Sequence, residues 1–317
     1  MLTSPAPMHI PDGFLTTAVS IVGWILAVVF VGMALRQTRR QMGDRQVPVM
    51  GVMAAFIFAA QAINFPVAAG TSGHLVGATL AAIVLGPWAA VLVMTSVLAV
   101  QALLFQDGGL IVLGWNLVNM AVLASLTGYG VYRLTLRVAG DHRPGRLAAA
   151  FAAAWTSVEV GALAATVELA ISGTTSLSLA LPAMAGVHAL IGLGEGVITL
   201  GALALLLTSR PEILRGAAMS PGQGAAHVMI GGLVLALIVA LFSPLASAHP
   251  DGLNAVAGAL AFSDQARSLG WGVWQGYALP GLSQPAAATI LGVALGTLVV
   301  FAVAVVVARR LRPAAAK

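Results

Sequence analysis

The sequence predicts an all-α polytopic membrane protein, a helical bundle of about nine transmembrane segments. Of its 317 residues, 59% are hydrophobic and only 8% are charged. The apolar runs are too long and too numerous for the core of a soluble domain. The basic residues stand singly or in pairs between these runs, which is typical of membrane topology rather than of a nucleic-acid-binding face. We therefore expect membrane lipid, and no nucleic acid, around this chain.

Nine apolar segments can be placed with a simple ruler, because a bilayer core of about 30 Å needs about 20 helical residues. The predicted spans are 14–35, 47–65, 74–86, 88–105, 110–132, 147–171, 180–207, 225–245 and 286–308. The third span is too short to cross comfortably, so it is expected to be short, tilted or partly re-entrant. Gly86-Pro87 predicts a tight corner between the third and fourth spans.

The positive charges predict the orientation of the bundle. If the nine spans alternate, the basic residues after the first, fifth, seventh and ninth spans share one side, and only Arg267 lies on the other. The residues on the shared side are Arg36, Arg39, Arg40, Arg45, Arg133, Arg137, Arg143, Arg146, Arg210, Arg215, Arg309, Arg310, Arg312 and Lys317. Since cytoplasmic loops are enriched in Arg and Lys, we expect the C-terminus in the cytoplasm and the N-terminus outside. His9 and His74 then share the outer face.

The composition also predicts two parts. Gly and Pro gather in the stretch 208–224, which we interpret as a cytoplasmic linker. It separates a seven-span part, 8–207, from a two-span part, 225–312, whose loop 246–285 faces outward. No basic residue precedes Phe14, so the first span is expected to be a retained helix rather than a signal peptide.

The absence of cysteine and the scarcity of lysine exclude several functions. The chain has no cysteine, which excludes disulfides, thiolate metal sites and cysteine nucleophiles. Its one lysine is Lys317, so no glycine-rich loop carries the phosphate-binding lysine of an ATPase. If ATP drives this protein, another subunit must hydrolyse it.

A candidate metal site precedes the first span. In a chain that begins at Met8, the amine of Met8, the amide nitrogen that follows it and the imidazole of His9 can bind one ion through two fused small rings. An imidazole from His74 completes a planar set of four nitrogens, which suits nickel(II) or copper(II). The sequence begins at Met1, and with that extension the nitrogen of Met8 is an ordinary peptide nitrogen. The alternative is that His9 is an interfacial polar residue and Asp12 forms a turn or helix cap.

His74 follows the loop Gly70-Thr71-Ser72-Gly73, where backbone can approach a ligand closely. Its alternative role is that of a histidine anchored in a glycine-rich turn. Farther along the chain, His188 and Glu195 fall on roughly one face of a predicted span. Glu159, Glu168, Asn116 and Asn119 are their candidate partners. We expect Asp12, Thr71, Ser72, His188 and Glu195 to form a structural polar network or to support the metal site.

Two functions of other classes remain open. Gly70-Thr71-Ser72-Gly73 matches the short serine motif of rhomboid-type intramembrane proteases, with His188 as a conceivable base. The chain could also form an ion channel. His249 and Asp251 are expected to lie in a solvated loop, with external metal capture as their alternative role. His142 and His227 accompany the cytoplasmic charges and are expected to be solvated.

Four motifs together resemble the NikM/CbiM family, the substrate-specific membrane components of energy-coupling factor transporters for nickel and cobalt. They are Met8-His9-Ile10-Pro11-Asp12-Gly13-Phe14-Leu15, Gly70-Thr71-Ser72-Gly73-His74-Leu75, Leu85-Gly86-Pro87-Trp88-Ala89-Ala90 and His188-Ala189-Leu190-Ile191-Gly192-Leu193-Gly194-Glu195-Gly196. Residues 225–312, with His249-Pro250-Asp251-Gly252-Leu253, are similar to the small two-span partner component that some members carry as a fusion.

This resemblance implies a transport component of the inner (cytoplasmic) membrane and not an enzyme. It implies that Ni²⁺ or Co²⁺ is the substrate, with no covalently bound cofactor. A coupling transmembrane subunit and a pair of cytoplasmic ATPases are the implied partners. The family's metal ligands correspond to the nitrogens of Met8 and His9 and to the imidazole of His74. That site uses a free amino terminus, so either translation begins at Met8, or the extension is removed, or the site of this chain differs. Of these three, we expect translation to begin at Met8. The first two motifs are more similar to the nickel members than to the cobalt members.

Overall fold

The structure is a computed structural model, and it describes residues 8–41, 43, 46–68, 70–214, 223–270 and 272–312. Helices dominate it, and six of those in the described ranges are long and apolar enough to cross a membrane. These six are Thr17–Gln41, Pro87–Phe105, Arg143–Ile171, Leu177–Ser209, Ala226–Leu245 and Pro285–Leu311. The predicted class, an all-α membrane protein, is confirmed, while the count of nine spans stays a prediction.

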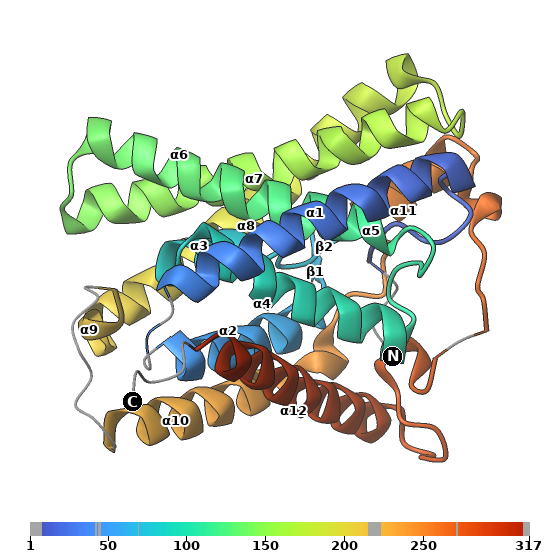
Figure 1. Cartoon of the computed structure of the whole chain (residues 1–317). Helices are drawn as coiled ribbons and strands as arrows, with labels where there is room; N and C mark the ends of the chain where they lie inside the picture. Colours follow the sequence, from blue (N-terminus) through green and yellow to red (C-terminus); the bar gives the residue numbers. More distant parts are fainter. Residues whose placement is uncertain are drawn as a thin grey trace.

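Figure 1 shows the elements in their order along the chain. The first half contains α1 (Thr17–Gln41), α2 (Gln46–Gln61), β1 (Phe65–Pro66), β2 (Ser72–Gly73), α3 (Ala78–Leu85), α4 (Pro87–Val100), η1 (Gln101–Phe105), α5 (Leu113–Asn116), η2 (Leu117–Leu123) and α6 (Ala124–Ala139). The second half contains α7 (Arg143–Ile171), α8 (Leu177–Ser209), α9 (Pro211–Leu214), α10 (Gln223–Ala240), η3 (Ser243–Leu245), α11 (Gly252–Ala259), η4 (Ser263–Gln265), η5 (Gln275–Tyr277) and α12 (Pro285–Leu311).

The three predicted spans outside this set of six are also helical. α2 is an apolar helix of 16 residues, and α3 has only eight. The fifth predicted span is built from α5, the π-helical η2 and α6 in direct succession. The predicted corner lies at Gly86, whose φ of 85° ends α3, while Pro87 occupies the first turn of α4. Glycine tolerates that backbone angle, and proline at a helix start sacrifices no hydrogen bond.

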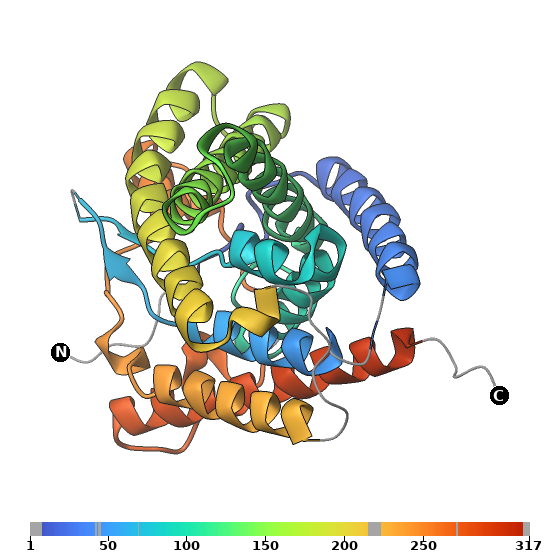
Figure 2. The same ribbon diagram turned by 90° about the vertical axis from the view of Figure 1, so that its left-hand side faces the viewer.

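The two long helices of the C-terminal part, α10 and α12, both pack along α2 (Figure 2). Glycines bring these helices close together, since a Cβ on Gly232 would lie 2.3 Å from a methyl carbon of Val52. Likewise, a Cβ on Gly51 would lie 2.4 Å from a methyl carbon of Val305. Small residues matter here because lipid tails are as apolar as the helices, so association depends on close packing. The C-terminal part is therefore packed against the first part along the helices.

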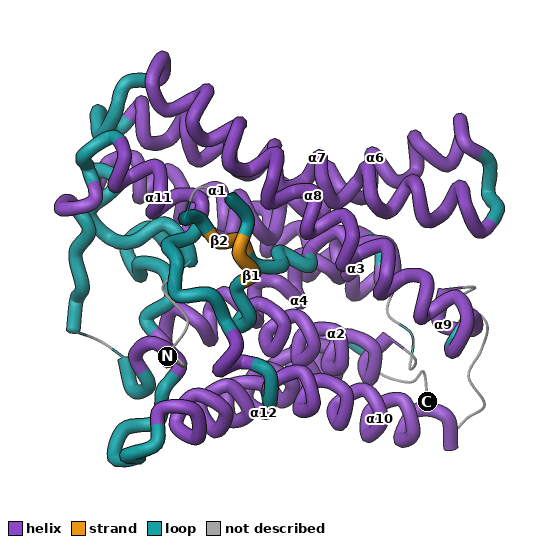
Figure 3. The backbone as a smooth tube through the Cα atoms, turned by 180° about the vertical axis from the view of Figure 1, so that it is seen from behind, coloured by secondary structure: helices purple, strands orange, loops and turns teal. Residues whose placement is uncertain are grey.

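The connection from α10 to α12 is fastened to the first part at the end of the bundle where the loops gather (Figure 3). Four backbone N–H groups donate across this contact: Ser247 to the Asn64 carbonyl, Ser72 to Pro250, Arg267 to Asp12 and Trp274 to Leu104, at 2.7 to 2.8 Å. The loop predicted for 246–285 is thus a folded segment that covers the end of the bundle.

The turn between α6 and α7 and the helix α9 lie at one end of the bundle, and α11 lies at the other (Figure 1). The arginines of the last turns of α1, α6 and α12 are Arg39, Arg40, Arg137, Arg309 and Arg310. The direction of the chain through the membrane stays a prediction. Arg45, Arg215, Lys317, the Met1–Pro7 extension and part of the predicted linker lie outside the described residues.

Candidate metal centre

The segment before α1 is held in place by the side chain of Asp12. Its carboxylate accepts hydrogen bonds from the backbone N–H groups of Leu110, Ile111 and Val112 at 3.0, 2.8 and 3.2 Å. Asp12 is only 4% exposed, so these bonds replace the water that the carboxylate loses. These hydrogen bonds fasten the segment of His9 to the loop between η1 and α5. From the sequence we expected only that this segment and this loop lie on the same side of the membrane.

Two nitrogen atoms of this segment converge on one oxygen. The backbone N–H of Met8 donates to Asp107 Oδ1 at 2.7 Å, and His9 Nδ1 lies 3.0 Å from the same atom. Ile10 and Asn116 keep the backbone in this position through two hydrogen bonds of 3.1 Å. Because carboxylate oxygens accept, Nδ1 of His9 carries the proton, and His9 Nε2 is buried with no hydrogen-bond partner among the residues that the structure describes. A cation that takes the place of the proton on Nδ1 would meet this nitrogen beside that of Met8.

His74 reaches the same place from a different part of the chain. Its ring centroid lies 5.7 Å from that of His9, with the two rings at 75°. His74 Nδ1 donates to the carbonyl of Leu75 at 3.0 Å, which leaves Nε2 as the acceptor nitrogen. Metal-binding histidines usually donate their other ring N–H to a carbonyl or carboxylate in this way. The two histidines that the sequence placed on one face are therefore neighbours.

Glu195 of α8 holds the backbone that carries His74. Its two carboxylate oxygens accept from the N–H groups of Val76 and Gly77 at 2.6 and 2.8 Å. Glu195 is fully buried, and Gly77 has a φ of 78°, which glycine adopts without strain. Glu195 was predicted to belong to a polar network, and its partners in the structure are backbone N–H groups. Through these two hydrogen bonds, Glu195 fixes the position of the loop that carries His74.

The glycine-rich loop forms a small hairpin in which β1 pairs with β2. The carbonyl of Thr71 accepts from the Val67 N–H at 2.9 Å, so Thr71 acts here through its backbone. The hydroxyl of Ser72 donates to the carbonyl oxygens of His249 and Pro250 at 2.8 and 3.2 Å. A nucleophilic serine would instead donate to a basic side chain. Ser72 therefore joins the hairpin to the C-terminal part and lacks the arrangement of a protease nucleophile.

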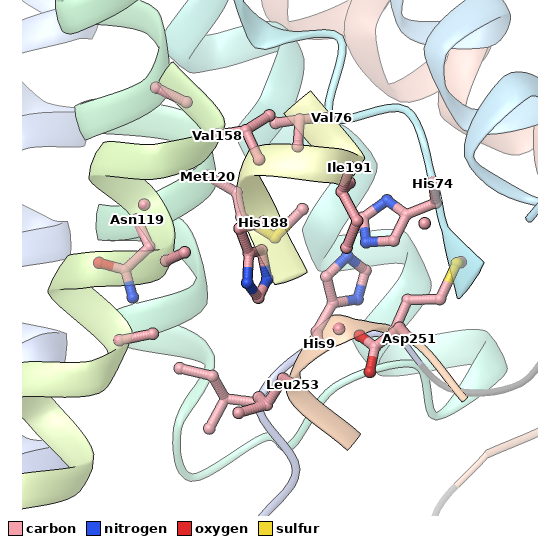
Figure 4. A pocket seen from close by; sticks show the side chains of 18 of the residues that line it. His9, His74, Val76, Asn119, Met120, Val158, His188, Ile191, Asp251 and Leu253 are labelled. Carbon is pink, nitrogen blue, oxygen red and sulfur yellow. The ribbon is translucent and has the colours of Figure 1, made fainter. Parts of the chain in front are cut away.

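His9, His74, His188 and Asp251 line one cavity of about 100 Å³ (Figure 4). His188 Nδ1 donates to the Met184 carbonyl at 2.8 Å, so its Nε2 is also an acceptor. Asp251 is 4% exposed and comes from the C-terminal part, where the sequence predicted a solvated loop. That expectation is wrong for Asp251, because the loop packs onto the bundle. Figure 4 shows the His188 ring beside the His9 and His74 pair.

The electrostatics of the two ligand candidates differ. Burial lowers the pKa of His9, but the carboxylate of Asp107 outweighs burial and raises that pKa above its usual value. Burial opposes ionisation of Asp107 too, yet His9, Tyr277 and the Met8 N–H together lower the pKa of Asp107. His74 has no carboxylate bonded to it, so burial and the neighbouring His9 lower its pKa to about 4. His74 is therefore neutral and ready to bind a cation across the physiological range.

The partners predicted for the buried helix residues differ from those observed. Asn119 donates to Glu168 at 3.1 Å, and Asn116 bonds to the backbone of the N-terminal segment rather than to His188 or Glu195. Glu159 has a buried oxygen with no hydrogen-bond partner among the described residues. These pairings could not be assigned from helical spacing, because residues on neighbouring helices meet according to how the helices rotate.

The histidines predicted to be solvated lie on the surface. His142, His227 and His249 are exposed, and His142 caps α7 by accepting from the N–H of Gly145 at 3.1 Å. Sequence reasoning missed Asp107, which lies in the turn Gln106-Asp107-Gly108-Gly109 between the predicted fourth and fifth spans. The available signal was that Asp107 is a carboxylate in a turn on the same predicted side of the membrane as His9 and His74.

Side chains alone do not complete a site in the part of the chain that the structure describes. No three His, Asp or Glu side chains there are arranged to hold a metal ion together. The nitrogen of Met8, which points to the same oxygen as His9 Nδ1, has to be counted among the donors. The chelate of amine, amide and imidazoles stays a prediction.

Two known protein families match different parts of the chain. Residues 9–213 match the family model described as the cobalt uptake substrate-specific transmembrane region, CbiM. Residues 226–313 match the PDGLE domain.

Related proteins are named for nickel or cobalt transport. A putative fused nickel transport protein NikMN of Archaeoglobus fulgidus is 36% identical over 97% of this chain and 100% of its own length. The fused nickel transport protein NikMN of Rhodobacter capsulatus is 33% identical over 73% of this chain and 71% of its own. The cobalt transport protein CbiM of Sorangium cellulosum is 35% identical over 65% of this chain and 94% of its own.

The fold is similar to a crystal structure of a transition metal transporter, with a TM-score of 0.59 and 32% identity. That similarity covers 68% of this chain and all of the other. Together with the membrane helices and the paired histidines, these relationships point to a transporter rather than an enzyme. The chain belongs to the CbiM family, as a multi-pass nickel or cobalt transport component of the CbiM/NikM type with a PDGLE domain behind it.

Proposed function

We propose that this chain is the substrate-binding component of an ATP-powered importer of the energy-coupling factor type, located in the cytoplasmic membrane. It binds Ni²⁺ in preference to Co²⁺ at the outer face. A coupling transmembrane subunit and a pair of cytoplasmic ATPases act with it, since Lys317 is the only lysine and no phosphate-binding loop is present.

One observation carries the proposal: the nitrogen of Met8 and Nδ1 of His9 point to the same atom, Asp107 Oδ1, at 2.7 and 3.0 Å. A divalent ion that displaces their protons would meet both nitrogens from one direction. The ring of His74, 5.7 Å from that of His9, supplies a further nitrogen beside them. Asp107 adds a negative charge that compensates the ion in a buried place.

The preference for nickel rests on the chemistry of these donors. Amine, amide and imidazole nitrogens in a plane suit nickel(II), whereas carboxylate and water ligands suit harder ions. The full chelate needs a free amine at Met8, so we propose that the chain beginning at Met8 is the form that binds metal with full affinity. In the chain that begins at Met1, the same atom is a peptide nitrogen, which binds a metal far less readily.

Native mass spectrometry tests the metal and the amino terminus together. Detergent-purified protein, made separately with its start at Met1 and at Met8, is incubated with equal concentrations of nickel and cobalt. We expect the form that begins at Met8 to carry one nickel ion and the longer form to carry less. Both forms free of metal would contradict the proposal. A longer form that binds equally well would show that the amine is not a ligand.

Acidification is expected to weaken metal binding in two separate steps, because protons compete with the ion for the imidazoles. His9 takes up its proton first, because its pKa is raised above the usual imidazole value of about 6.5. His74 follows only near pH 4, because its pKa is lowered. NMR of labelled histidines gives each titration, and calorimetry gives the nickel affinity over the same pH range. Simultaneous titration of both rings would contradict this order.

A further inference from the structure

Tyr277 is a buried tyrosine of the C-terminal part that reaches the candidate metal centre from the other side of Asp107. It ends the short helix η5 and is only 1% exposed. Its hydroxyl donates to Asp107 Oδ2 at 2.5 Å, while Oδ1 of the same carboxylate receives the N–H of Met8 and faces His9. The two oxygens of Asp107 therefore have different tasks. One meets the candidate ligands, and the other meets Tyr277.

The ring of Tyr277 is fixed by packing rather than by this hydrogen bond alone. It stacks on Phe105 with 4.8 Å between centroids and an angle of 19°, and it lies 6.0 Å from Phe58. Gln101 donates to the Tyr277 oxygen at 3.1 Å, which leaves the hydroxyl proton for Asp107. The phenol is thus held by neighbours on three sides, and its one free donor is directed at the carboxylate.

The backbone at this contact is unusual on both sides. Tyr277 has a φ of 63°, and Gln106, the neighbour of Asp107, has a φ of 54°. Residues with a side chain seldom adopt this left-handed conformation, which costs free energy and persists only where the surroundings enforce it. One of these two positions is Tyr277 itself and the other directly precedes Asp107, so both adjoin the hydrogen bond between Tyr277 and Asp107. The contact is therefore maintained against a local preference for other backbone angles.

We propose that Tyr277 is a positioning residue for the cargo ion: by holding one oxygen of Asp107, it aims the other oxygen at Met8 and His9. The inference rests on the proposed function, because it assigns Asp107 to the nickel site. A carboxylate without this hydroxyl can rotate about its side-chain bonds. The Met8 nitrogen and His9 Nδ1 would then no longer share Asp107 Oδ1 as their acceptor. The C-terminal part thereby supplies a residue that positions a side chain of the site, although most residues of the site come from the first part.

The test is Tyr277→Phe, which removes the hydroxyl and keeps the ring that stacks on Phe105. Outer partners of metal ligands change metal affinity by about 10- to 100-fold, so we expect the nickel Kd of the variant to rise by at least about tenfold. The visible absorption spectrum of bound nickel should also shift, since it reports the arrangement of the donors. Tyr132→Phe is the matched control, because Tyr132 is a buried tyrosine of α6 that lies outside the lining of the cavity.

The protein that begins at Met8 is used in detergent, with nickel as the probe, and its thermal midpoint is measured beside affinity and spectrum. A weaker Kd with a shifted spectrum in Tyr277→Phe, and neither change in Tyr132→Phe, supports the inference. An unchanged Kd, or a weaker Kd with the wild-type spectrum, overturns it and leaves Tyr277 as an anchor for the loop, whatever the thermal midpoint. Failure of the unmodified protein to bind nickel would instead overturn the proposed function.

Discussion

Replacement of His74 by alanine is expected to raise the nickel Kd by more than about 100-fold. Loss of an outer partner already costs about 10- to 100-fold, and the loss of a direct donor costs more. His74 is suited to this role because its pKa of about 4 keeps it neutral and its Nδ1 is bound to a carbonyl, which leaves Nε2 free. Isothermal titration calorimetry of the purified protein gives the affinity. The helical bundle should stay folded, because His74 lies in a loop.

His142→Asn is the matched control for this substitution. His142 is exposed and caps α7 at the opposite end of the bundle, and asparagine is a good helix cap in its place. We expect its nickel affinity to equal that of the unmodified protein. If His74→Ala bound nickel as tightly as this control, the pair of His9 and His74 would not be the site. Circular dichroism of both variants verifies that neither change has unfolded the helices.

Glu195→Gln is expected to weaken nickel binding by at least about tenfold and to lower the free energy of unfolding by about 2 kcal/mol. Glu195 accepts from two buried N–H groups, those of Val76 and Gly77, which follow His74 directly. A glutamine can accept only one of them and turns its own NH₂ toward the other, and an unsatisfied buried donor costs about 1–3 kcal/mol. The loop should then move, and with it the imidazole.

Glu168→Gln is the control for the chemistry of this change. Glu168 is also a buried glutamate of a long helix, but its partner is the side chain of Asn119. Glutamine can still accept from Asn119, so we expect a smaller loss of stability and an unchanged nickel affinity. Thermal unfolding and calorimetry are measured on both variants. Equal nickel affinities in the two variants would mean that Glu195 stabilises the fold without positioning His74.

The long helices could be predicted from the sequence, although α1 and α6 extend beyond their predicted spans and α11 was not predicted. The apolar run that predicted a span at 286–308 is the helix Pro285–Leu311, and Gly86-Pro87 marked the corner before α4. Each of these features is local, because lipid accepts apolar side chains one by one and a backbone without water must satisfy its own hydrogen bonds. The shared side of His9 and His74 followed from counting such spans. It needed no knowledge of how the helices pack.

The partners inside the site depended on packing and could not be read in this way. Asp107 and Tyr277 are 170 residues apart in the chain, yet they share a hydrogen bond. Asp251 was expected in solvent and lies instead in the wall of the cavity. Helical spacing tells which residues share a face but not which face of another helix they meet. That depends on how far each helix rotates and tilts as small residues allow close approach.

The sequence by itself determined that the chain is a helical membrane protein, where its helical segments lie, and that His9 and His74 are candidate metal ligands. Hydropathy and motif spacing suffice for this because they act over short stretches of chain. Only the tertiary structure decided that Met8 and His9 converge on Asp107, that Glu195 holds the loop of His74, and that Tyr277 of the C-terminal part stands behind the carboxylate. Buried polar groups must find partners wherever the fold brings them. The identity of those partners is therefore a property of the packed bundle rather than of any one segment.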